Sequence, residues 1–175
     1  MPNTSETNER HVMAVLVDNE PGVLARVVGL FSGRGYNIES LTVATISEDE
    51  SVSRINLATS GTPMIIAQIK AQLERLVPVR EVHDLTQDGP HVDHEVVLVK
   101  IRNTGSERRE ALRIADIFRA RVVDTAFDAF VFSLTGSSNK VDSFLELMRR
   151  LGDVEIARSG VVAIAREAKS KPQPE

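Results

Sequence analysis

The chain has 175 residues, of which 42% are apolar and 26% charged, as in an ordinary globular protein of one large or two small domains. Its net charge of −4 is spread along the chain, which argues against a nucleic-acid surface with clustered basic residues. The absence of cysteine excludes disulfides, thiolate nucleophiles and thiolate zinc sites. A polar start predicts no signal peptide, and no apolar run approaches the roughly 20 residues that span a bilayer, so we expect a cytoplasmic protein without a membrane segment.

The first half of the chain begins with a strand pattern and a helix pattern. The apolar run over residues 11–17 predicts a buried strand that ends in a polar turn. Apolar residues at helical spacing then predict an amphipathic helix, with Pro21 suited to its first position and Gly33 and Gly35 ending it. The predicted buried stripe of this helix consists of Leu24, Val27, Val28 and Phe31.

Two strands, a helix and a last strand complete this half. The strands are expected over residues 36–46 and 52–59, around a polar hairpin turn, and the last one over 77–85. Along 52–59 the predicted buried residues are Ile55 and Leu57, and the predicted exposed ones are Arg54 and Asn56. Thr62 and Pro63 are typical of a helix start. The buried stripe of that helix is expected to be Ile65 or Ile66 with Ile69, Leu73 and Leu76.

The second half repeats this order of elements after a linker at residues 87–90. Its strands are expected over residues 95–102, 121–126, 130–134 and 154–164. The first helix is expected to bury Leu112, Ala115 and Phe118, and the second Val141, Phe144, Leu145, Met148 and Leu151. Core positions are also expected at Val161, Val162 and Ile164. In the ferredoxin-like fold the same order of elements places helices on one face of an antiparallel sheet.

The sequence therefore predicts an α+β protein with two ferredoxin-like βαββαβ domains. We place the first domain at residues 10–87 and the second at 93–166, with flexible tails at 1–9 and 167–175. No strong residue-level identity links the two halves, so the repeat is one of architecture.

Catalytic and metal-binding motifs are not evident in the sequence. It contains no G-x-S-x-G turn and no phosphate loop of the G-x-x-x-x-G-K type. The segment Gly33-Arg34-Gly35 follows a helix and precedes a strand, the reverse of a dinucleotide-binding fingerprint, so a helix end is favoured. His91 and His94 would point to opposite faces of an extended segment, and no third ligand is evident. We therefore expect no catalytic residue, metal or cofactor in this chain.

The turn after the first strand is the segment that favours a binding site. A strand that turns sharply into a helix presents unpaired backbone N–H groups, and these and the helix dipole favour an anion such as a carboxylate. Gly22 lets a ligand approach the backbone, and Asn19 can both donate and accept, as an amino acid requires. An ordinary helix start with an Asn or Asp cap explains the same residues, so the turn alone leaves both interpretations open.

Longer segments resemble a known family. Asp18-Asn19-Glu20-Pro21-Gly22-Val23-Leu24 resembles the strand-to-helix signature of ACT domains, which are ferredoxin-like amino-acid sensors. Residues 26–32, 34–43 and 157–162 resemble the regulatory small subunit of acetohydroxyacid synthase, also called acetolactate synthase. The resemblance runs from about His11 to Arg166, and the segment from Gly35 to Val43 is its most specific part.

The resemblance implies a subunit of branched-chain amino-acid biosynthesis that raises the activity of a catalytic subunit and confers feedback inhibition by valine. That catalytic partner would carry thiamine diphosphate, Mg²⁺ and FAD. Small subunits of this family pair through their ACT sheets, with two effector sites at the interface. The residues matched to the polar end of the effector are Asn19, Gly22, Val23 and Leu24. Those expected to close the site from the neighbouring protomer are Asn37 and Ile38.

Other classes of function compete with this one. A free-standing two-domain ACT sensor that acts on another partner would carry the same turn. An RNA-binding ferredoxin-like module would need exposed aromatic residues on its central strands, and residues 52–58 contain none. A stand-alone enzyme would need a catalytic constellation that the sequence does not show.

Overall fold

The computed structural model describes residues 7–102 and 104–167. They form two compact units, one of residues 7–92 with 163–167 and the other of residues 93–162, and each is described by itself. Residues 163–166 thus group with the N-terminal unit, whereas the sequence pattern places them in the second domain. Of the predicted flexible tails, residues 1–6 and 168–175 lie outside the described residues, and Glu9 already belongs to the first strand.

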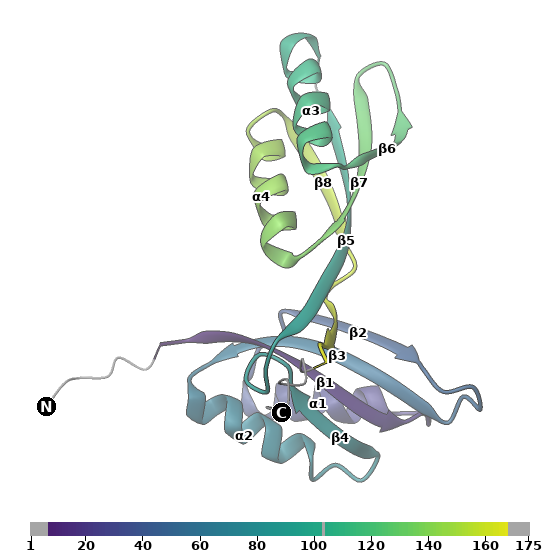
Figure 1. Ribbon diagram of the computed structural model, residues 1–175, viewed down its shortest axis with the longest axis vertical. Coiled ribbons are helices and arrows are strands. Elements are labelled where there is room, and N and C mark those ends of the chain that lie inside the picture. Colours follow the sequence, from purple (N-terminus) through teal and green to yellow (C-terminus); the bar gives the residue numbers. More distant parts are fainter. Residues whose placement is uncertain (1–6, 103, 168–175) are drawn as a thin grey trace, which may run out of the picture. The chain divides into compact units, whose positions relative to one another are not determined.

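The N-terminal unit is an antiparallel sheet with two helices on one face (Figure 1). The strands lie in the order β2-β3-β1-β4, so the two central strands are β1 and β3. Its elements are β1 (Glu9–Asp18), α1 (Val23–Arg34), β2 (Ser40–Thr45), β3 (Val52–Gly61), α2 (Pro63–Leu73) and β4 (Val79–Asp84). This is the predicted ferredoxin-like order, and that prediction is confirmed.

Alternation along the central strands directs one set of apolar side chains toward the helices. Met13 and Val15 of β1 pair in register with Leu57 and Ile55 of β3, and all four are fully buried. Helix α1 adds Val23, Val27 and Phe31 to this core, and α2 adds Ile66, Ile69 and Leu73. Thr62 accepts a hydrogen bond from the Ile65 N–H and Pro63 opens α2, as predicted, because proline has no N–H to leave unpaired there.

Three details of α1 differ from the prediction. The helix begins at Val23 with Gly22 as its N-cap, so Pro21 lies in the preceding turn and not at the first helical position. Gly33 lies inside the helix, and only Gly35 ends it, in a left-handed conformation that glycine adopts without strain. The buried stripe is narrower than predicted, because Leu24 and Val28 are 41% and 38% exposed.

The ends of two strands also differ. β2 begins at Ser40, not at residue 36, and Tyr36, Asn37 and Ile38 form an irregular connection after α1. β4 covers Val79–Asp84, shorter than the predicted range of 77–85.

Asn56 is buried, although the alternation of β3 predicts it to be exposed. Ala163 in the last strand, β9 (Val162–Ala165), accounts for this difference. Arg54, beside Asn56 on β3, donates to the Ala163 backbone carbonyl at 2.9 Å, and Ala163 is itself buried. A segment distant in sequence thus covers the face of β3 that carries Arg54 and Asn56. Burial lowers the pKa of Arg54 from its usual value.

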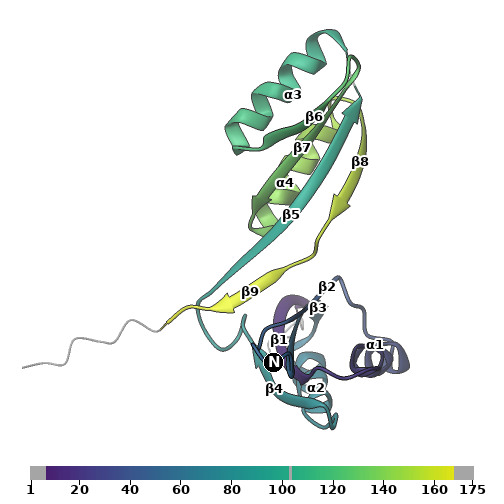
Figure 2. The same ribbon diagram turned by 90° about the vertical axis from the view of Figure 1, so that its right-hand side faces the viewer.

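The second unit has the same topology (Figure 2). Its elements are β5 (His91–Arg102), α3 (Gly105–Phe118), β6 (Arg121–Thr125), β7 (Ala129–Gly136), α4 (Ser138–Arg149) and β8 (Asp153–Arg158). The strands lie in the order β6-β7-β5-β8, which matches the first sheet strand for strand, and β9 pairs with β5 off this path. The predicted second ferredoxin-like domain is therefore confirmed.

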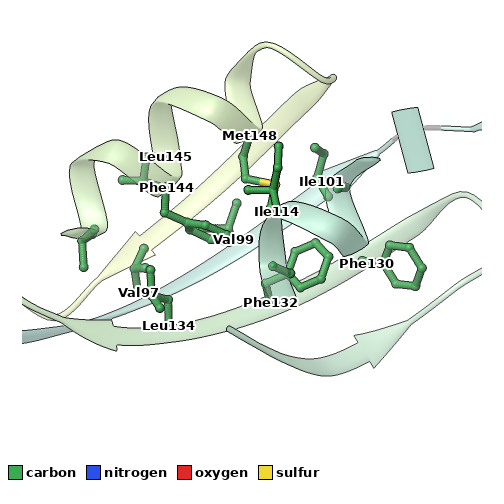
Figure 3. Close-up of a cluster of buried hydrophobic side chains, with 13 residues drawn as sticks. Val97, Val99, Ile101, Ile114, Phe130, Phe132, Leu134, Phe144, Leu145 and Met148 are labelled. Atoms are coloured by element: carbon green, nitrogen blue, oxygen red, sulfur yellow. The ribbon is translucent and has the colours of Figure 1, made fainter. Parts of the chain in front are cut away.

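The core of the second unit is built around phenylalanine. Phe132 and Phe144 meet edge to face between the sheet and the helices, with ring centroids 6.4 Å apart (Figure 3). Helix α3 contributes Ala111, Ile114 and Ala115, whereas Leu112 is exposed, contrary to the prediction. Helix α4 buries Val141, Phe144, Leu145 and Met148, as predicted.

The predicted last strand is interrupted. Gly160 adopts a φ of 84°, which separates β8 from β9 where the sequence predicts one strand over 154–164. Val161 is buried as expected, but Val162 and Ile164 are exposed.

A charged cluster joins the start of β5 to the end of β8. The carboxylate of Glu95 is buried and accepts hydrogen bonds from Arg158 and Ser138. Arg158 also contacts Asp142 at 2.8 Å. The hydrogen bond to Glu95, and less so the one to Asp142, raises the pKa of Arg158. The cluster therefore ties β5, α4 and β8 together with fixed charges.

Candidate functional site

The turn between β1 and α1 exposes the start of a helix. Gly22 caps α1 with a φ of 86°, and no side chain provides a capping hydrogen bond. The Gly22 carbonyl accepts from the Arg26 N–H, whereas the N–H groups of Leu24 and Ala25 have no acceptor within the described residues. No acidic residue lies in the first turn of α1. The helix start is thus a set of free donors at a positive dipole end, which suits an anion.

Asn19 is anchored by its donor atoms. Its side-chain Nδ2 donates to the Glu50 carbonyl at 2.8 Å and lies 3.4 Å from the Thr45 hydroxyl, and its backbone N–H donates to the Ser51 carbonyl. Its Oδ1 has no partner within the described residues. The β2–β3 turn therefore orients Asn19 so that an acceptor oxygen is left for a ligand.

A small pocket of about 80 Å³ lies at this turn. Its wall combines the end of β1 and the start of α1 with residues of β2 and β3. The lining residues are Val17, Asp18, Asn19, Glu20, Val23, Leu24, Val43, Ser53 and Ile55. The mixture of an aliphatic floor and a few polar groups is typical of a site for a small amphipathic ligand.

The two carboxylates at the pocket each have an arginine partner. Asp18 contacts Arg80 at 2.6 Å, and Glu20 contacts Arg26 at 3.4 Å. These exposed ion pairs partly neutralise the negative charge of the turn, so the carboxylates do not oppose an anion at the helix start.

The structure brings four of the six predicted site residues together. Asn19, Val23 and Leu24 line the pocket and Gly22 caps the adjoining helix. Asn37 and Ile38 lie beyond the other end of α1, where the Asn37 carbonyl accepts from the Thr59 hydroxyl at 2.7 Å and Ile38 packs against the core. Neither lines the pocket of its own chain.

Val43 and Ser53 complete the pocket, and the sequence analysis did not select them. Val43 belongs to the segment from Gly35 to Val43 that carries the family resemblance, so that segment held a usable signal. Ser53 becomes visible only through strand pairing, since it lies opposite Val17 in β1 and Thr45 in β2.

The turn that holds Asn19 is itself fixed by a carboxylate. Hydrogen bonds from Ser47 and Ser51 lower the pKa of Asp49 from 3.8 to about 2. The Ser51 hydroxyl and N–H donate to the same Asp49 oxygen at 2.8 and 3.1 Å. The backbone that anchors Asn19 is therefore ordered by local bonds.

The described residues offer neither a metal centre nor a membrane-spanning helix. Residues 7–102 and 104–167 contain no group of three or more His, Asp or Glu side chains arranged to hold a metal ion. None of the helices in that same part of the chain has the length and apolar character needed to cross a bilayer.

Comparisons with known proteins agree with this geometry. Residues 13–81 match the family described as AHAS small subunit-like ACT domain, and residues 94–167 match the small subunit of acetolactate synthase. The chain is 45% identical over 161 residues to the acetolactate synthase isozyme 3 small subunit of Escherichia coli, covering 91% of this chain and 98% of that protein. The chain belongs to the acetolactate synthase small-subunit family.

Relatives from distant organisms extend this family assignment. The probable acetolactate synthase small subunit of Archaeoglobus fulgidus is 42% identical, over 91% of this chain and 99% of its own length. The crystal structure of the acetolactate synthase small subunit from Thermotoga maritima is 34% identical, with a TM-score of 0.79, covering 92% of this chain and 99% of that one. The small-subunit family thus accounts for nearly the whole chain, with the ACT domain at residues 13–81.

Proposed function

We propose that this chain is a non-catalytic regulatory subunit of acetolactate synthase that activates the catalytic subunit and confers feedback inhibition by valine. The observation that carries the proposal is the pocket at the start of α1, which Asn19 and aliphatic side chains line beside the N–H groups of Leu24 and Ala25, for which the described residues offer no acceptor. These three elements correspond to the carboxylate, the ammonium group and the branched side chain of valine.

The chemistry of each contact follows from the groups present. The valine carboxylate would accept from the N–H groups of Leu24 and Ala25, which the helix dipole reinforces. The ammonium group would donate to Asn19 Oδ1, and the isopropyl group would contact Val23, Leu24 and Val43. Gly22 lets the carboxylate approach because no side chain projects there.

Pairing of two chains would complete the site. Complete pockets for small ligands are roughly 300–1,000 Å³, whereas this one is about 80 Å³. Strand β2 lies at the edge of its sheet. Exposed apolar residues lie in β2, directly after it and in α1: Val43, Ile46, Leu24 and Val28. In a homodimer joined at this edge, Asn37 and Ile38 of the neighbouring protomer would close the pocket.

Regulation would work through the geometry of that homodimer. Valine held between two protomers would favour one arrangement of the pair, which in turn changes how the catalytic subunit is held. Such coupling requires different affinities for two states, typically about 1–3 kcal/mol. Thiamine diphosphate, Mg²⁺ and FAD would be carried by the catalytic partner in the cytoplasm.

Calorimetry tests the proposal directly. Valine titrated into the purified chain should bind with a stoichiometry of one per protomer, and the binding should disappear if dimers are dissociated. Added to a cognate catalytic subunit, the chain should raise acetolactate production and make it sensitive to valine. A chain that neither binds valine nor changes that activity would contradict the proposal.

A free-standing two-domain ACT sensor is the second candidate, because the same pocket would serve it. A pull-down from the cognate extract separates the two. Recovery of a thiamine diphosphate enzyme supports the subunit, and recovery of another partner alone supports the sensor.

A further inference from the structure

A second pocket lies on the N-terminal unit, away from the effector pocket. It is open to solvent and has a volume of about 360 Å³. We call it the helix-face pocket. Its lining residues come from α1, from the end of α2 and from the turn that follows α2: Gly29, Leu30, Gly33, Arg34, Gln72 and Arg75. It shares no residue with the effector pocket.

Two glycines expose the backbone of α1 in this pocket. Gly29 and Gly33 are one helical turn apart, so they lie on the same face of α1. A Cβ added at either position would meet no atom within 4 Å. Glycine inside a helix is less stable than alanine, and no packing contact explains its presence here. The open space is therefore available to a ligand.

Among the described residues, three polar side chains of the helix-face pocket have groups without a partner. Arg34 and Arg75 form no ion pair with an acidic residue within the described chain, so two like charges border one pocket. The Oε1 of Gln72 is buried and accepts no hydrogen bond from any described residue. An anion would satisfy the two guanidinium groups, and a neighbouring donor would satisfy Gln72.

We propose that the helix-face pocket binds a small organic carboxylate that carries a hydroxyl group next to the carboxylate. The carboxylate would contact Arg34 and Arg75, and the hydroxyl would donate to Gln72 Oε1. An ammonium donor is disfavoured because it would face two guanidinium groups. The aliphatic part would lie against Leu30 and the bare backbone at Gly29 and Gly33. This site is independent of the proposed effector site.

Three related ligands test the proposal on the full-length chain by calorimetry. 2-Hydroxyisovalerate carries both groups, isovalerate lacks the hydroxyl, and valine replaces the hydroxyl with an ammonium group. With saturating valine present, 2-hydroxyisovalerate should still bind, with a Kd below about 1 mM. Isovalerate should bind roughly tenfold more weakly, because Gln72 Oε1 stays unpaired.

Matched variants locate the binding. Arg34→Gln and Arg75→Gln should each weaken 2-hydroxyisovalerate by roughly tenfold, and the double variant should abolish binding. Gly29→Leu should also abolish it by filling the pocket, without removing a charge. Arg113→Gln, an exposed helical arginine of the second unit, is the control and should bind normally.

The opposing outcomes are equally definite. No binding of 2-hydroxyisovalerate up to about 10 mM would overturn the site. Equal binding of isovalerate would overturn the role of Gln72 and the ligand class. Loss of binding in the presence of valine would place the ligand in the effector pocket, and unchanged binding in the double arginine variant would exclude the helix-face pocket.

Discussion

Two turns occupy the same place in the two units: the one between β1 and α1 and the one that leads from β5 into α3. Both helices begin beside a glycine with positive φ, Gly22 at 86° and Gly105 at 63°. Yet α1 has no acidic residue in its first turn, whereas α3 carries Glu107 there. The dipole of α3 thus has an acidic side chain in its first turn, and the dipole of α1 has none.

The side chains that follow reinforce this difference. Arg108 of α3 donates to the Ala126 carbonyl at 3.0 Å and lies over the Phe130 ring at 3.7 Å from its centre. The equivalent start of α1 instead presents Val23 and Leu24 to a pocket. The same topology thus leaves a small pocket beside the helix start in the first unit, whereas the second unit places Arg108 against the Phe130 ring and the Ala126 carbonyl.

Giving α1 the acid that α3 already has should erase this difference. Gly22→Asp places a carboxylate at the dipole end where the ligand carboxylate would lie. Valine affinity should fall by at least about a thousandfold, and valine inhibition of the reconstituted enzyme should vanish while activation persists. Calorimetry and acetolactate assays measure the two effects.

Two variants control for backbone strain. Gly22→Asn adds similar bulk without charge, and asparagine tolerates positive φ, so valine binding should weaken less. Gly105→Asp strains the equivalent turn of the second unit and should leave valine binding unchanged. Full valine sensitivity in Gly22→Asp would remove the turn from the effector site.

A second likeness between the two units is a hydrogen-bonded pair around a buried carboxylate. In the first unit His11 of β1 meets Asp84 of β4 at 2.8 Å, and in the second Glu95 of β5 meets Arg158 of β8. Register shows that the positions are equivalent, because Asp84 lies opposite Met13 and Arg158 opposite Val97, each two residues beyond its partner. The acidic residue thus lies on the last strand of the pair in the first unit, Asp84 on β4, and on the first strand in the second unit, Glu95 on β5.

Removing the base should cost the two units different amounts. Arg158→Met leaves the buried Glu95 carboxylate without its cation and should destabilise the protein by about 3 kcal/mol. His11→Leu should cost only about 1 kcal/mol, because Asp84 still accepts from the Thr86 and Gln87 N–H groups. Urea unfolding measures both values.

The double variant Glu95→Leu/Arg158→Met is the control for the larger effect. With both charges gone it should recover most of the lost stability, since no uncompensated charge stays buried. A double variant as unstable as Arg158→Met alone would show that packing, and not charge, explains the loss.

Asn19 lines the pocket of the first unit, and its replacement should have a moderate effect. Asn19→Ala removes the acceptor proposed for the ammonium group and the link to the Glu50 carbonyl. Valine should bind about tenfold more weakly, or about 1.4 kcal/mol. Thr45→Val removes the weaker contact to Asn19 Nδ2 and a 3.5 Å contact to the Ser53 hydroxyl, and it should change the affinity little. An equal loss in both variants would assign the effect to the turn.

The sequence predicted the architecture because both halves carry clear strand and helix periodicities. It was wrong where a contact distant in sequence decides burial. Asn56 is buried because Arg54 on the same strand bonds to Ala163, 109 residues away, which no local pattern reveals. Leu24 and Val28 continue the apolar stripe of α1 but are exposed, and nothing in the local pattern shows which part of the stripe the sheet covers.

The candidate site was predictable in part. Asn19, Gly22, Val23 and Leu24 are adjacent in sequence, so one turn sufficed to group them. Pro21 was predicted at the first helical position but lies two residues before it, because Gly22 takes the left-handed cap position that proline cannot adopt. The part played by Asn37 and Ile38 stays a prediction, since they lie outside the pocket of their own chain.

The smallest expected effect distinguishes the two hairpin turns. The β6–β7 turn exposes Phe127 almost completely, whereas the β2–β3 turn is closed by hydrogen bonds from Ser47 and Ser51 that lower the pKa of Asp49 to about 2. The ionised carboxylate therefore stabilises its turn above pH 3.8, and this contribution is lost as the pH falls toward 2. NMR titration of the Asp49 carboxyl carbon should give a midpoint near 2, and Ser51→Ala should raise it toward 3.8. A wild-type midpoint already near 3.8 would mean that these bonds do not hold the turn that anchors Asn19.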